Sequence, residues 1–536
     1  MSAGSFDTFF ESFDADSEKR GKQWEFACKW FLENDGVYSE LERVWLWDDW
    51  PDRDGPDIGI DLVAKTKDGK LWAVQAKAWE ANITKSDIDS FFSASEGSRF
   101  RERLLITTSE GVAPNARRTI DESATPFSMV CRHDLEDRDC WPESYAALEA
   151  GQRPQITKAT PRPHQQEALD AALEGLQHND RGQVIMACGT GKTLTALWLH
   201  ERLSSERTLV VLPSLSLLNQ TLLEWTKHTA APFQFLPVCS DETVRQGSSE
   251  DAALQNTSTL GYPVTTDPAE VRDFLTQAGQ RVIFSTYQSS PVVAEAMAGS
   301  DRSFDLIIAD EAHRCAGRIS TAFGTLLDQE KIPSRKRIFM TATPRVFASW
   351  VTRLAREDDQ EIASMDDAAV FGSELYRLSF AQAIERDLLS DYRVLVVGID
   401  DAEYRRYAEY GRFVTIDGEE VNAREVASQI GLAKAIHKYD LRRIITFHGR
   451  VKKASRFSRM LPRVVEWMPG DERPTGPLWA QVVSGKMPTG ERRRHLNRLK
   501  KLEDSERGIL SNARCLGEGI DVPTLDGIAF IDPKQS

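Results

Sequence analysis

The segment QVIMACGTGKTLTALWLHERL, residues 183–203, decides the fold of the largest part of this chain. An apolar run ends in the glycine-rich turn ACGTGKT (187–193), and a helical pattern follows directly. Backbone amides of such a turn can surround a phosphate at a helix N-terminus, where Lys192 neutralises charge and the Thr193 hydroxyl can ligate magnesium. We therefore predict a nucleotide site on an α/β sheet.

A second motif, DLIIADEAH at residues 305–313, ends another apolar run in two adjacent carboxylates. Parallel sheets bind ligands at the carboxyl edge of their strands, so Asp310 and Glu311 would meet the glycine-rich turn there. Asp310 can hold magnesium, and Glu311 can orient or deprotonate an attacking water. A glycine-rich turn with an incidental lysine is an ordinary structural feature, but the carboxylate pair makes nucleotide hydrolysis the better interpretation.

Strands alternate with helices around these motifs, which indicates parallel sheets covered on both faces. The strands expected in a first domain are QVIMAC (183–188), TLVVLP (208–213), RVIFSTYQ (281–288), DLIIADEAH (305–313) and RIFMTATP (337–344). A second round comprises YRVLVVGID (392–400), RRIITFHGR (442–450), LWAQVVSG (478–485), GILSNAR (508–514) and GIAFIDP (527–533). The polar region 241–267 is predicted to be a flexible insertion.

Composition limits the class of protein. A chain of 536 residues exceeds the ~250–300 at which one core stops growing, so two to four domains are expected. The 82 acidic and 67 basic residues give a net charge of −15, which excludes a generally basic nucleic-acid binder and makes any DNA contact local. Without an apolar stretch of membrane length or a signal-peptide pattern, we expect a cytoplasmic protein. The seven cysteines form no CxxC pair, which argues against a disulfide framework or a zinc site.

The N-terminal region has its own α/β pattern. Two alternating runs, IDLVAKT (60–66) and KLWAVQAK (70–77), flank an Asp-Gly turn and predict a hairpin. A helical pattern over 21–34 precedes the hairpin, and a helix over 86–95 and a strand over 103–109 follow it. We expect a small, separate α/β domain.

This hairpin offers residues suited to phosphodiester cleavage. Asp61 opens its first strand, and Gln75 and Lys77, two apart on the second, project from one face. Glu25 on the preceding helix completes the set, with Asp57 as the rival for the main metal carboxylate. Nucleases commonly place carboxylates around a divalent metal and add a lysine that stabilises charge or positions water. A lysine two residues after a glutamine is also common at a solvated strand edge, and that alternative stays open.

From about residue 161 onward, the motifs resemble in order and spacing those of superfamily 2 DEAH helicases and translocases. RPHQ (162–165) is similar to the adenine-reading Q motif, and TAT (341–343) to the motif that couples hydrolysis to movement. In the second domain, FHGRVKKASRF (447–457) and SNARCLGEGIDVP (511–523) resemble motifs IV and V. The resemblance implies ATP and Mg²⁺ as cofactors and double-stranded DNA as partner.

The resemblance also assigns roles to individual residues. Those that it places against the nucleotide are Arg162, Gln165, Gly189, Thr190, Gly191, Lys192, Thr193, Gly519 and Asp521. Lys192, Asp310 and Glu311 would carry ATP hydrolysis. Magnesium would be held by Thr193 and Asp310. The residues that would couple hydrolysis to movement are His313, Thr341, Thr343 and Arg514.

The second motor domain is expected to be incomplete. In this family a sixth motif supplies arginines that reach the γ-phosphate, and the sequence ends at DPKQS (532–536), where that motif would open. Such an arginine is worth ~10³–10⁵ in turnover in related enzymes. We expect a fragment or truncated reading frame with weak or no ATP turnover on its own.

GPDIGIDL (55–62) followed by VQAK (74–77) resembles the Mrr-like branch of the PD-(D/E)xK nucleases, in which a glutamine replaces the usual glutamate of the second strand. A nuclease of this kind ahead of a superfamily 2 motor is similar to the N-terminal half of type ISP restriction-modification enzymes. That resemblance implies Asp61 as metal ligand, Glu25, Gln75 and Lys77 as its catalytic partners, and defence against foreign DNA. The alternative is a DNA repair or remodelling translocase with a catalytically dead N-terminal DNA-binding domain.

The expected fold class is α/β, with a restriction-endonuclease-like domain followed by two tandem RecA-like parallel-sheet domains, the second incomplete. The predicted boundaries are 1–145 for the nuclease domain, 146–160 for a linker, and 161–385 and 386–536 for the two motor domains. The methyltransferase and target-recognition region of type ISP enzymes is expected to be missing, because the sequence has no NPPY, DPPY or FxGxG motif.

Overall fold

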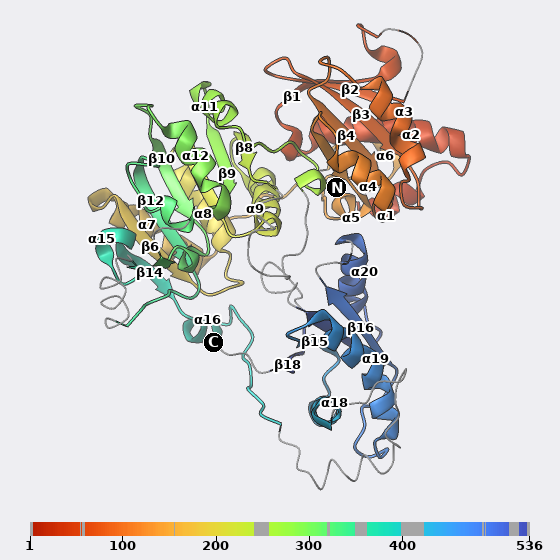
Figure 1. Ribbon diagram of the computed structural model, residues 1–536, viewed down its shortest axis with the longest axis vertical. Helices are drawn as coiled ribbons and strands as arrows, with labels where there is room; N and C mark the ends of the chain where they lie inside the picture. Colours follow the sequence, from red (N-terminus) through yellow and green to blue (C-terminus); the bar gives the residue numbers. More distant parts are fainter. Residues whose placement is uncertain are drawn as a thin grey trace. The chain divides into compact units, whose positions relative to one another are not determined.

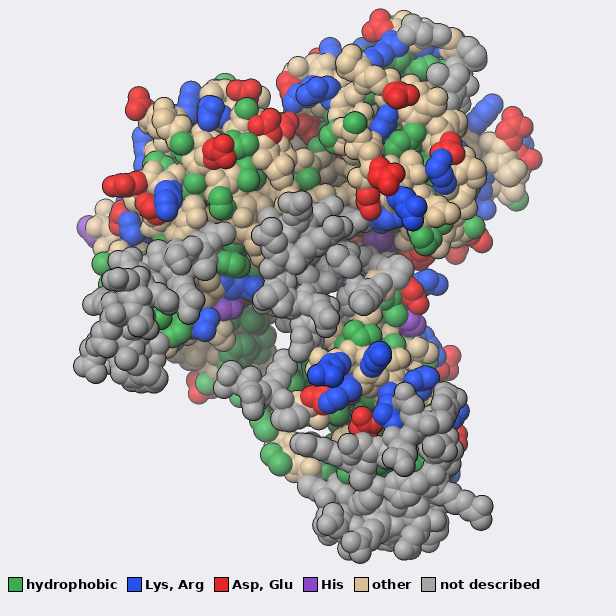
Figure 2. All heavy atoms as spheres, viewed as in Figure 1, with side chains coloured by type: hydrophobic (Ala, Val, Ile, Leu, Met, Phe, Trp, Pro, Cys, Tyr) green, Lys and Arg blue, Asp and Glu red, His purple; other side chains and the backbone are tan. Residues whose placement is uncertain are grey.

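The computed structural model describes the chain in two compact units, Met1–Val244 with Asn256–Asp391 (unit 1) and Arg245–Gln255 with Tyr392–Ser536 (unit 2). The described residues are 4–53, 55, 59–154, 156–240, 257–318, 322–348, 362–397, 423–484, 487, 489–513 and 525–532. In these residues no helix is both long and apolar enough to cross a membrane. On the face of unit 1 drawn in Figure 2, acidic and basic side chains are interspersed.

The N-terminal part of unit 1 is built on a five-stranded sheet in the order β1-β2-β3-β4-β5 (Figure 1). Its strands are β1 (Leu41–Leu46), β2 (Leu62–Thr66), β3 (Leu71–Lys77), β4 (Glu102–Thr107) and β5 (Phe127–Val130). β1, β2 and β3 pair antiparallel, whereas β3, β4 and β5 pair parallel. The predicted hairpin is confirmed as β2 and β3.

Alternating side chains of this sheet enter two apolar clusters, one on each face. Val74 and Leu104 join a cluster with helix α2 (Ser17–Asn34), while Ala73 and Leu105 join another. The second cluster includes side chains of α3 (Lys85–Ala94) and α4 (Pro114–Asp121). Helices therefore cover both faces, as the alternation of apolar residues in β3 and β4 requires.

The rest of unit 1 contains a seven-stranded sheet in the order β14-β6-β12-β10-β7-β9-β8, with every pair parallel. Its strands in chain order are β6 (Arg181–Met186), β7 (Arg207–Leu212), β8 (Gln234–Val238), β9 (Arg281–Thr286), β10 (Phe304–Ala309), β12 (Ser334–Thr341) and β14 (Ser373–Leu378). This architecture confirms the predicted fold class.

Helices cover both faces of the seven-stranded sheet (Figure 1). Side chains of α7 (Pro163–His178), α8 (Lys192–Arg202) and α9 (Leu215–His228) share one apolar cluster with alternate strand residues. Side chains of α11 (Pro268–Thr276) and α12 (Ser290–Met297) share the cluster on the other face. The first cluster also contains the buried residues of α2, so the two sheets of unit 1 are joined through a continuous apolar core.

Part of the predicted flexible insertion is ordered, which corrects that prediction. Residues 241–256 lie outside the described part, but Thr257–Thr259 form a 3-10 turn and Tyr262 is only 1% exposed. The Tyr38 hydroxyl donates a hydrogen bond to the Gly261 carbonyl at 2.7 Å, and the Tyr262 hydroxyl donates one to Asn219 Oδ1 at 3.0 Å. The polar composition of the segment gives no sign of these two tyrosine contacts. They hold the segment against both the five-stranded and the seven-stranded part of unit 1.

Unit 2 contains a parallel sheet in the order β16-β17-β15-β18. Its elements are α18 (Ala423–Tyr439), β15 (Arg443–Phe447), α19 (Val451–Trp467), β16 (Leu478–Ser484), α20 (Thr489–Lys500), β17 (Arg507–Ala513) and β18 (Gly527–Phe530). The strand predicted at YRVLVVGID is wrong for residues 392–397, which adopt no strand and leave Val394 79% and Val396 94% exposed. An apolar run forms a strand only where a neighbouring backbone pairs with it. Residues 398–400 lie outside the described part.

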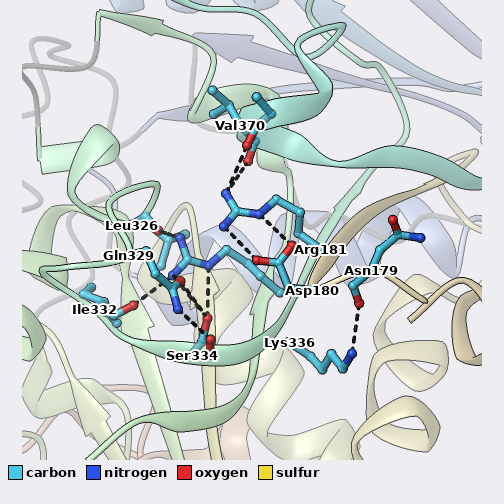
Figure 3. A network of polar contacts seen from close by, with 11 residues as sticks. Asn179, Asp180, Arg181, Leu326, Gln329, Ile332, Ser334, Lys336 and Val370 are labelled. Atoms are coloured by element: carbon cyan, nitrogen blue, oxygen red, sulfur yellow. Dashed lines mark hydrogen bonds and ion pairs between the residues drawn. The ribbon is translucent and has the colours of Figure 1, made fainter. Parts of the chain in front are cut away.

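A buried arginine organises the amino-terminal edge of the seven-stranded sheet, and Figure 3 shows its partners Leu326, Gln329, Ile332 and Ser334. Arg337 on β12 is 1% exposed, and its guanidinium donates to the carbonyls of Leu326 at 2.6 Å and Ile332 at 2.8 Å. It also donates to Gln329 Oε1 at 2.9 Å. Burial lowers the pKa of Arg337 to about 10, which leaves the group charged at neutral pH.

Replacing this arginine should destabilise unit 1. In Arg337→Met three buried acceptors lose their donor, so we expect the free energy of unfolding to fall by about 3 kcal/mol. Urea unfolding followed by tryptophan fluorescence measures the change. The matched control is Arg335→Met, two residues earlier, whose side chain is 76% exposed and should have almost no effect. Equal effects of the two substitutions would contradict the role given to the Arg337 network.

The second stability prediction concerns pH. Burial raises the pKa of Glu102 on β4 to about 8, although the Ser128 hydroxyl donates to its Oε1 at 2.9 Å. The native state therefore holds this proton more tightly than the unfolded chain, whose carboxyl has the ordinary pKa of 4.5. Ionising Glu102 therefore lowers the stability of the native state. This loss is absent below the unfolded-state pKa of 4.5 and grows as the pH rises to about 8.

Glu102→Gln should consequently stabilise unit 1 increasingly as pH rises from 5 to 8, by up to about 1.4 kcal/mol per pH unit. Urea midpoints of the variant and the parent at pH 5, 6, 7 and 8 measure the trend. Glu42→Gln on β1, whose side chain is 55% exposed, is the control and should show no such trend. If the effect of Glu102→Gln on stability did not depend on pH, the raised pKa of Glu102 would be refuted.

Candidate functional site

The glycine-rich turn lies between β6 and α8, at the carboxyl edge of the seven-stranded sheet. Gly189 and Gly191 have φ angles of 80° and 87°, a region that side chains disfavour. A Cβ on Gly191 would also stand 2.1 Å from Gln165 Nε2. The buried Thr190 hydroxyl donates to the Ala187 carbonyl at 2.7 Å and closes the turn. These two glycines are therefore required by the shape of the loop.

Lys192, the first residue of α8, lies opposite the DEAH segment. Its Nζ is 3.6 Å from Glu311 Oε1, with the two side chains 10% and 17% exposed, and donates to the Met186 carbonyl at 3.4 Å. The structure thus brings together the lysine and the carboxylate that the sequence predicted for hydrolysis. A polyphosphate at the loop would meet a cation already positioned by the protein.

The two adjacent carboxyls have opposite pKa shifts. Burial, with the negative charge of Glu311, raises the pKa of Asp310 to about 6. Burial also acts to raise the pKa of Glu311, but contacts with His313 and Lys192 outweigh it and lower that pKa. Glu311 itself has a φ of 49°, which turns its side chain out of the line of β10. Asp310 therefore suits holding a cation, and Glu311, which ionises more easily, suits acting on a water molecule.

The donor set fits a divalent cation. Asp310 is a buried carboxyl without enough nearby positive charge to hold its pKa down, and a cation would supply that charge. Asp310 and the Thr193 hydroxyl on α8 are the oxygen donors that would hold it, as magnesium prefers. Tyr287, which donates from its hydroxyl to the Asp310 carbonyl at 2.6 Å, fixes this backbone position.

A chain of side chains connects the DEAH segment to the TAT segment. His313 Nδ1 lies 3.3 Å from Glu311 Oε2 and 3.0 Å from Thr341 Oγ1. Thr341 Oγ1 also accepts a hydrogen bond from the Thr343 backbone N–H at 3.2 Å. β12 lies between β6 and β10 in the sheet. These contacts therefore join the DEAH segment to the end of β12, and a role for them in coupling hydrolysis to movement stays a prediction.

Gln165 contacts the loop itself. Its Nε2 donates to the carbonyls of Thr190 and Gly191, both at 3.3 Å, and its Oε1 accepts from the Arg162 N–H at 2.8 Å. His164 Nε2 is 2.9 Å from the Thr190 carbonyl. These contacts tie α7 to the turn, and adenine recognition by Gln165 and Arg162 stays a prediction.

Several predicted positions lie outside the described residues. These are Asp57 of the nuclease set and Arg514, Gly519 and Asp521 of the second motor domain. Sequence reasoning did not single out His164 or Tyr287, although both lie in quoted motifs. Their partners are backbone carbonyls of distant segments, which no local pattern reveals.

The nuclease candidates gather where β2 begins and β3 ends. Asp61 Oδ2 accepts a hydrogen bond from the Ala76 N–H at 2.7 Å, which holds this carboxylate against β3. Gln75 is 1% exposed, and its Nε2 donates to the Gly59 carbonyl at 3.2 Å. Its Oε1 is buried and has no hydrogen-bond partner among the residues that the structure describes. A buried orphan amide oxygen beside a carboxylate fits a divalent cation, which would supply the missing partner.

Glu25 and Lys77 complete this set in different ways. The pKa of the Cys28 thiol is raised by burial first and then by Asp61 and Glu25, so both carboxylates lie near the same buried atom. Lys77 is the last residue of β3, with its backbone paired to Thr107 of β4, and its side chain is half-buried. The structure therefore places Asp61, Gln75 and Lys77 on the hairpin or at its start, and the approach of Glu25, on α2, to these three stays a prediction.

Comparison with known proteins adds to this geometry. Residues 33–148 match a family model described as restriction endonuclease, and residues 158–346 match one described as Type III restriction enzyme, res subunit. The chain is 26% identical over 407 residues to a probable helicase of African swine fever virus, covering 75% of this chain and 40% of that protein. It is 25% identical over 365 residues to the endonuclease subunit of the type I restriction enzyme EcoAI of Escherichia coli, covering 63% and 38%.

Among solved structures, the ATP-dependent type ISP restriction-modification enzyme LlaBIII bound to DNA is similar with a TM-score of 0.82 and 30% identity. The match covers 96% of this chain and 35% of that one. The chain therefore carries a restriction-endonuclease domain followed by a helicase domain, in the arrangement of a type ISP enzyme. It spans 40% or less of the length of each of these relatives.

The contact between His313 and Thr341 generates a prediction about hydrolysis. Thr341→Val keeps the side-chain volume but removes the hydroxyl, so His313 loses one partner of its ring nitrogen. We expect ATP binding to be unchanged and hydrolysis to slow by about tenfold, as for other orienting contacts. Single-turnover hydrolysis and nucleotide titration separate the two effects.

Thr286→Val is the matched control, because Thr286 ends another parallel strand of the same sheet, β9, and is also buried. Its hydroxyl donates to Ser289 Oγ at 3.1 Å and contacts none of the DEAH residues in the described part. If both valine variants slowed hydrolysis alike, the specific role of Thr341 would be excluded.

Proposed function

We propose that this chain, in which a restriction-endonuclease domain precedes a helicase domain, is an ATP-driven double-stranded DNA translocase coupled to a metal-dependent endonuclease that cleaves foreign DNA. The observation that carries the proposal is the presence of both constellations in unit 1. The Lys192–Glu311 pair occupies one sheet edge, and the Asp61, Gln75 and Lys77 group lies on a second sheet joined to it by a continuous apolar core.

In the motor, the chain's own residues perform the following tasks. Backbone amides of the turn and Lys192 bind the phosphates, and Glu311, which its low pKa keeps ionised, orients or deprotonates the attacking water. Thr193 and Asp310 would hold Mg²⁺, which when bound neutralises developing phosphate charge. His313 and Thr341 then relay the state of Glu311 to β12.

In the nuclease, Asp61 and the Gln75 amide oxygen would hold a divalent cation, with Glu25 close by. The cation, when bound, supplies Lewis-acid stabilisation of a phosphodiester. Lys77 binds the scissile phosphate or positions the attacking water from the end of β3. We further propose Mg²⁺ as this metal and a methyltransferase and target-recognition region as partner, since the solved type ISP relative is a restriction-modification enzyme.

The direct test is cleavage of plasmid DNA with Mg²⁺, with and without ATP. We expect Lys77→Ala to reduce cleavage at least a hundredfold, because the site loses the lysine ammonium that contacts the scissile phosphate or positions the water. The matched control is Lys65→Ala on the partner strand β2, an exposed lysine paired with Glu42, which should cleave like the parent. Lys192→Ala should leave cleavage without ATP unchanged and remove any effect of ATP.

Cleavage that persists in Lys77→Ala would contradict the nuclease assignment. It would also favour the alternative reading of a repair or remodelling translocase whose N-terminal domain only binds DNA. ATP-dependent changes that survive Lys192→Ala would contradict the motor assignment. Thermal unfolding of each variant, compared with the parent, excludes misfolding as the cause.

A further inference from the structure

A tryptophan continues the line of nuclease residues beyond the end of β3. Gln75, Lys77 and Trp79 occupy alternate positions, so their side chains share one face. The Thr108 N–H donates to the Lys77 carbonyl at 3.0 Å, and the Thr108 hydroxyl donates to the Trp79 carbonyl at 2.9 Å. The backbone is thus held beside β4 as far as Trp79. Exposure rises along this line from 1% at Gln75 to 40% at Trp79.

The Trp79 ring lies against the candidate catalytic lysine. Lys77 Nζ is 5.3 Å from the centre of the ring. Trp72 and Trp50 of this domain are buried, each with 2% exposure, and Trp45 is partly buried. Trp79 belongs to none of the apolar clusters formed by the described residues. Packing therefore does not account for a large apolar ring at this position.

We propose that Trp79 is a DNA-contacting residue of the nuclease site, against which the deoxyribose next to the scissile phosphate packs. The inference rests on the proposed function, because it takes the phosphate to be bound at Lys77. A ring that contacts the lysine ammonium lies within reach of the nucleoside attached to that phosphate. Aromatic side chains beside cations are the usual platform for nucleotides, because every base and sugar presents an apolar face.

The experiment compares Trp79→Leu, which removes the aromatic ring, with Trp79→Phe, which retains one. Cleavage of a duplex in Mg²⁺ is measured over a range of DNA concentrations to separate KM from kcat. For Trp79→Leu we expect KM to rise by about tenfold with little change in kcat, as for the loss of one stacking contact. Trp79→Phe should stay within about threefold of the parent.

Two controls isolate the effect. Trp45→Leu on β1 removes a second tryptophan, whose ring lies 5.3 Å from the Arg43 guanidinium, and should leave KM unchanged. Thermal unfolding of Trp79→Leu should match the parent, because an exposed ring contributes little to the core. Binding of the same duplex without metal, followed by tryptophan fluorescence, should show a smaller signal and weaker affinity for Trp79→Leu.

The outcomes distinguish the inference from the proposal on which it rests. If Lys77→Ala abolishes cleavage but Trp79→Leu has a parental KM and parental affinity, the inference is wrong and the nuclease assignment stands. If kcat falls and KM is unchanged, Trp79 only positions Lys77, and DNA contact is again refuted. If Lys77→Ala cleaves like the parent, the nuclease assignment fails and the inference fails with it.

Discussion

The contact between Lys192 and Glu311 is the interaction around which the motor site of unit 1 is organised. It joins the turn after β6 to the end of β10. β12 lies between these strands and carries Thr341, which contacts His313 beside Glu311. Both charges are largely buried, so neither is stable there without the other or a ligand in its place. At this sheet edge the backbones of Gly189, Gly191 and Glu311 all have positive φ angles, and this backbone shape brings the two charges together.

The nuclease hairpin satisfies a different constraint. Its central polar residue, Gln75, is buried, and within the described part of the chain its amide nitrogen has a hydrogen-bond partner while its oxygen has none. A neutral amide tolerates burial better than a carboxylate, but its oxygen remains a metal donor. Asp61 is held against β3 by the Ala76 N–H, and Lys77 ends the strand, so the donors of the proposed metal site lie on the hairpin or at its start.

Unit 1 combines these sites in one body. The apolar cluster on one face of the nuclease sheet continues into the cluster beneath α7, α8 and α9. Polar contacts at the same junction include the ion pair of Lys227 with Asp139 and the bond from Tyr38 to Gly261. A continuous core of this kind resists independent movement of its halves, because sliding would expose apolar surface. The five-stranded and seven-stranded sheets of unit 1 therefore form one packed body.

The sequence by itself determined the parts of this protein that depend on local pattern. The turn at 187–193, the carboxylates of DEAH and the hairpin around Gln75 were all evident, because turn chemistry and strand alternation act between near neighbours. The tertiary structure decided which side chains meet: Tyr38 on Gly261, Gln165 on the turn, Trp79 on Lys77. It also decided that residues 392–397 form no strand and that 257–265 are packed. Pairing and burial depend on distant segments, and their positions are set by the whole core and not by the residues themselves.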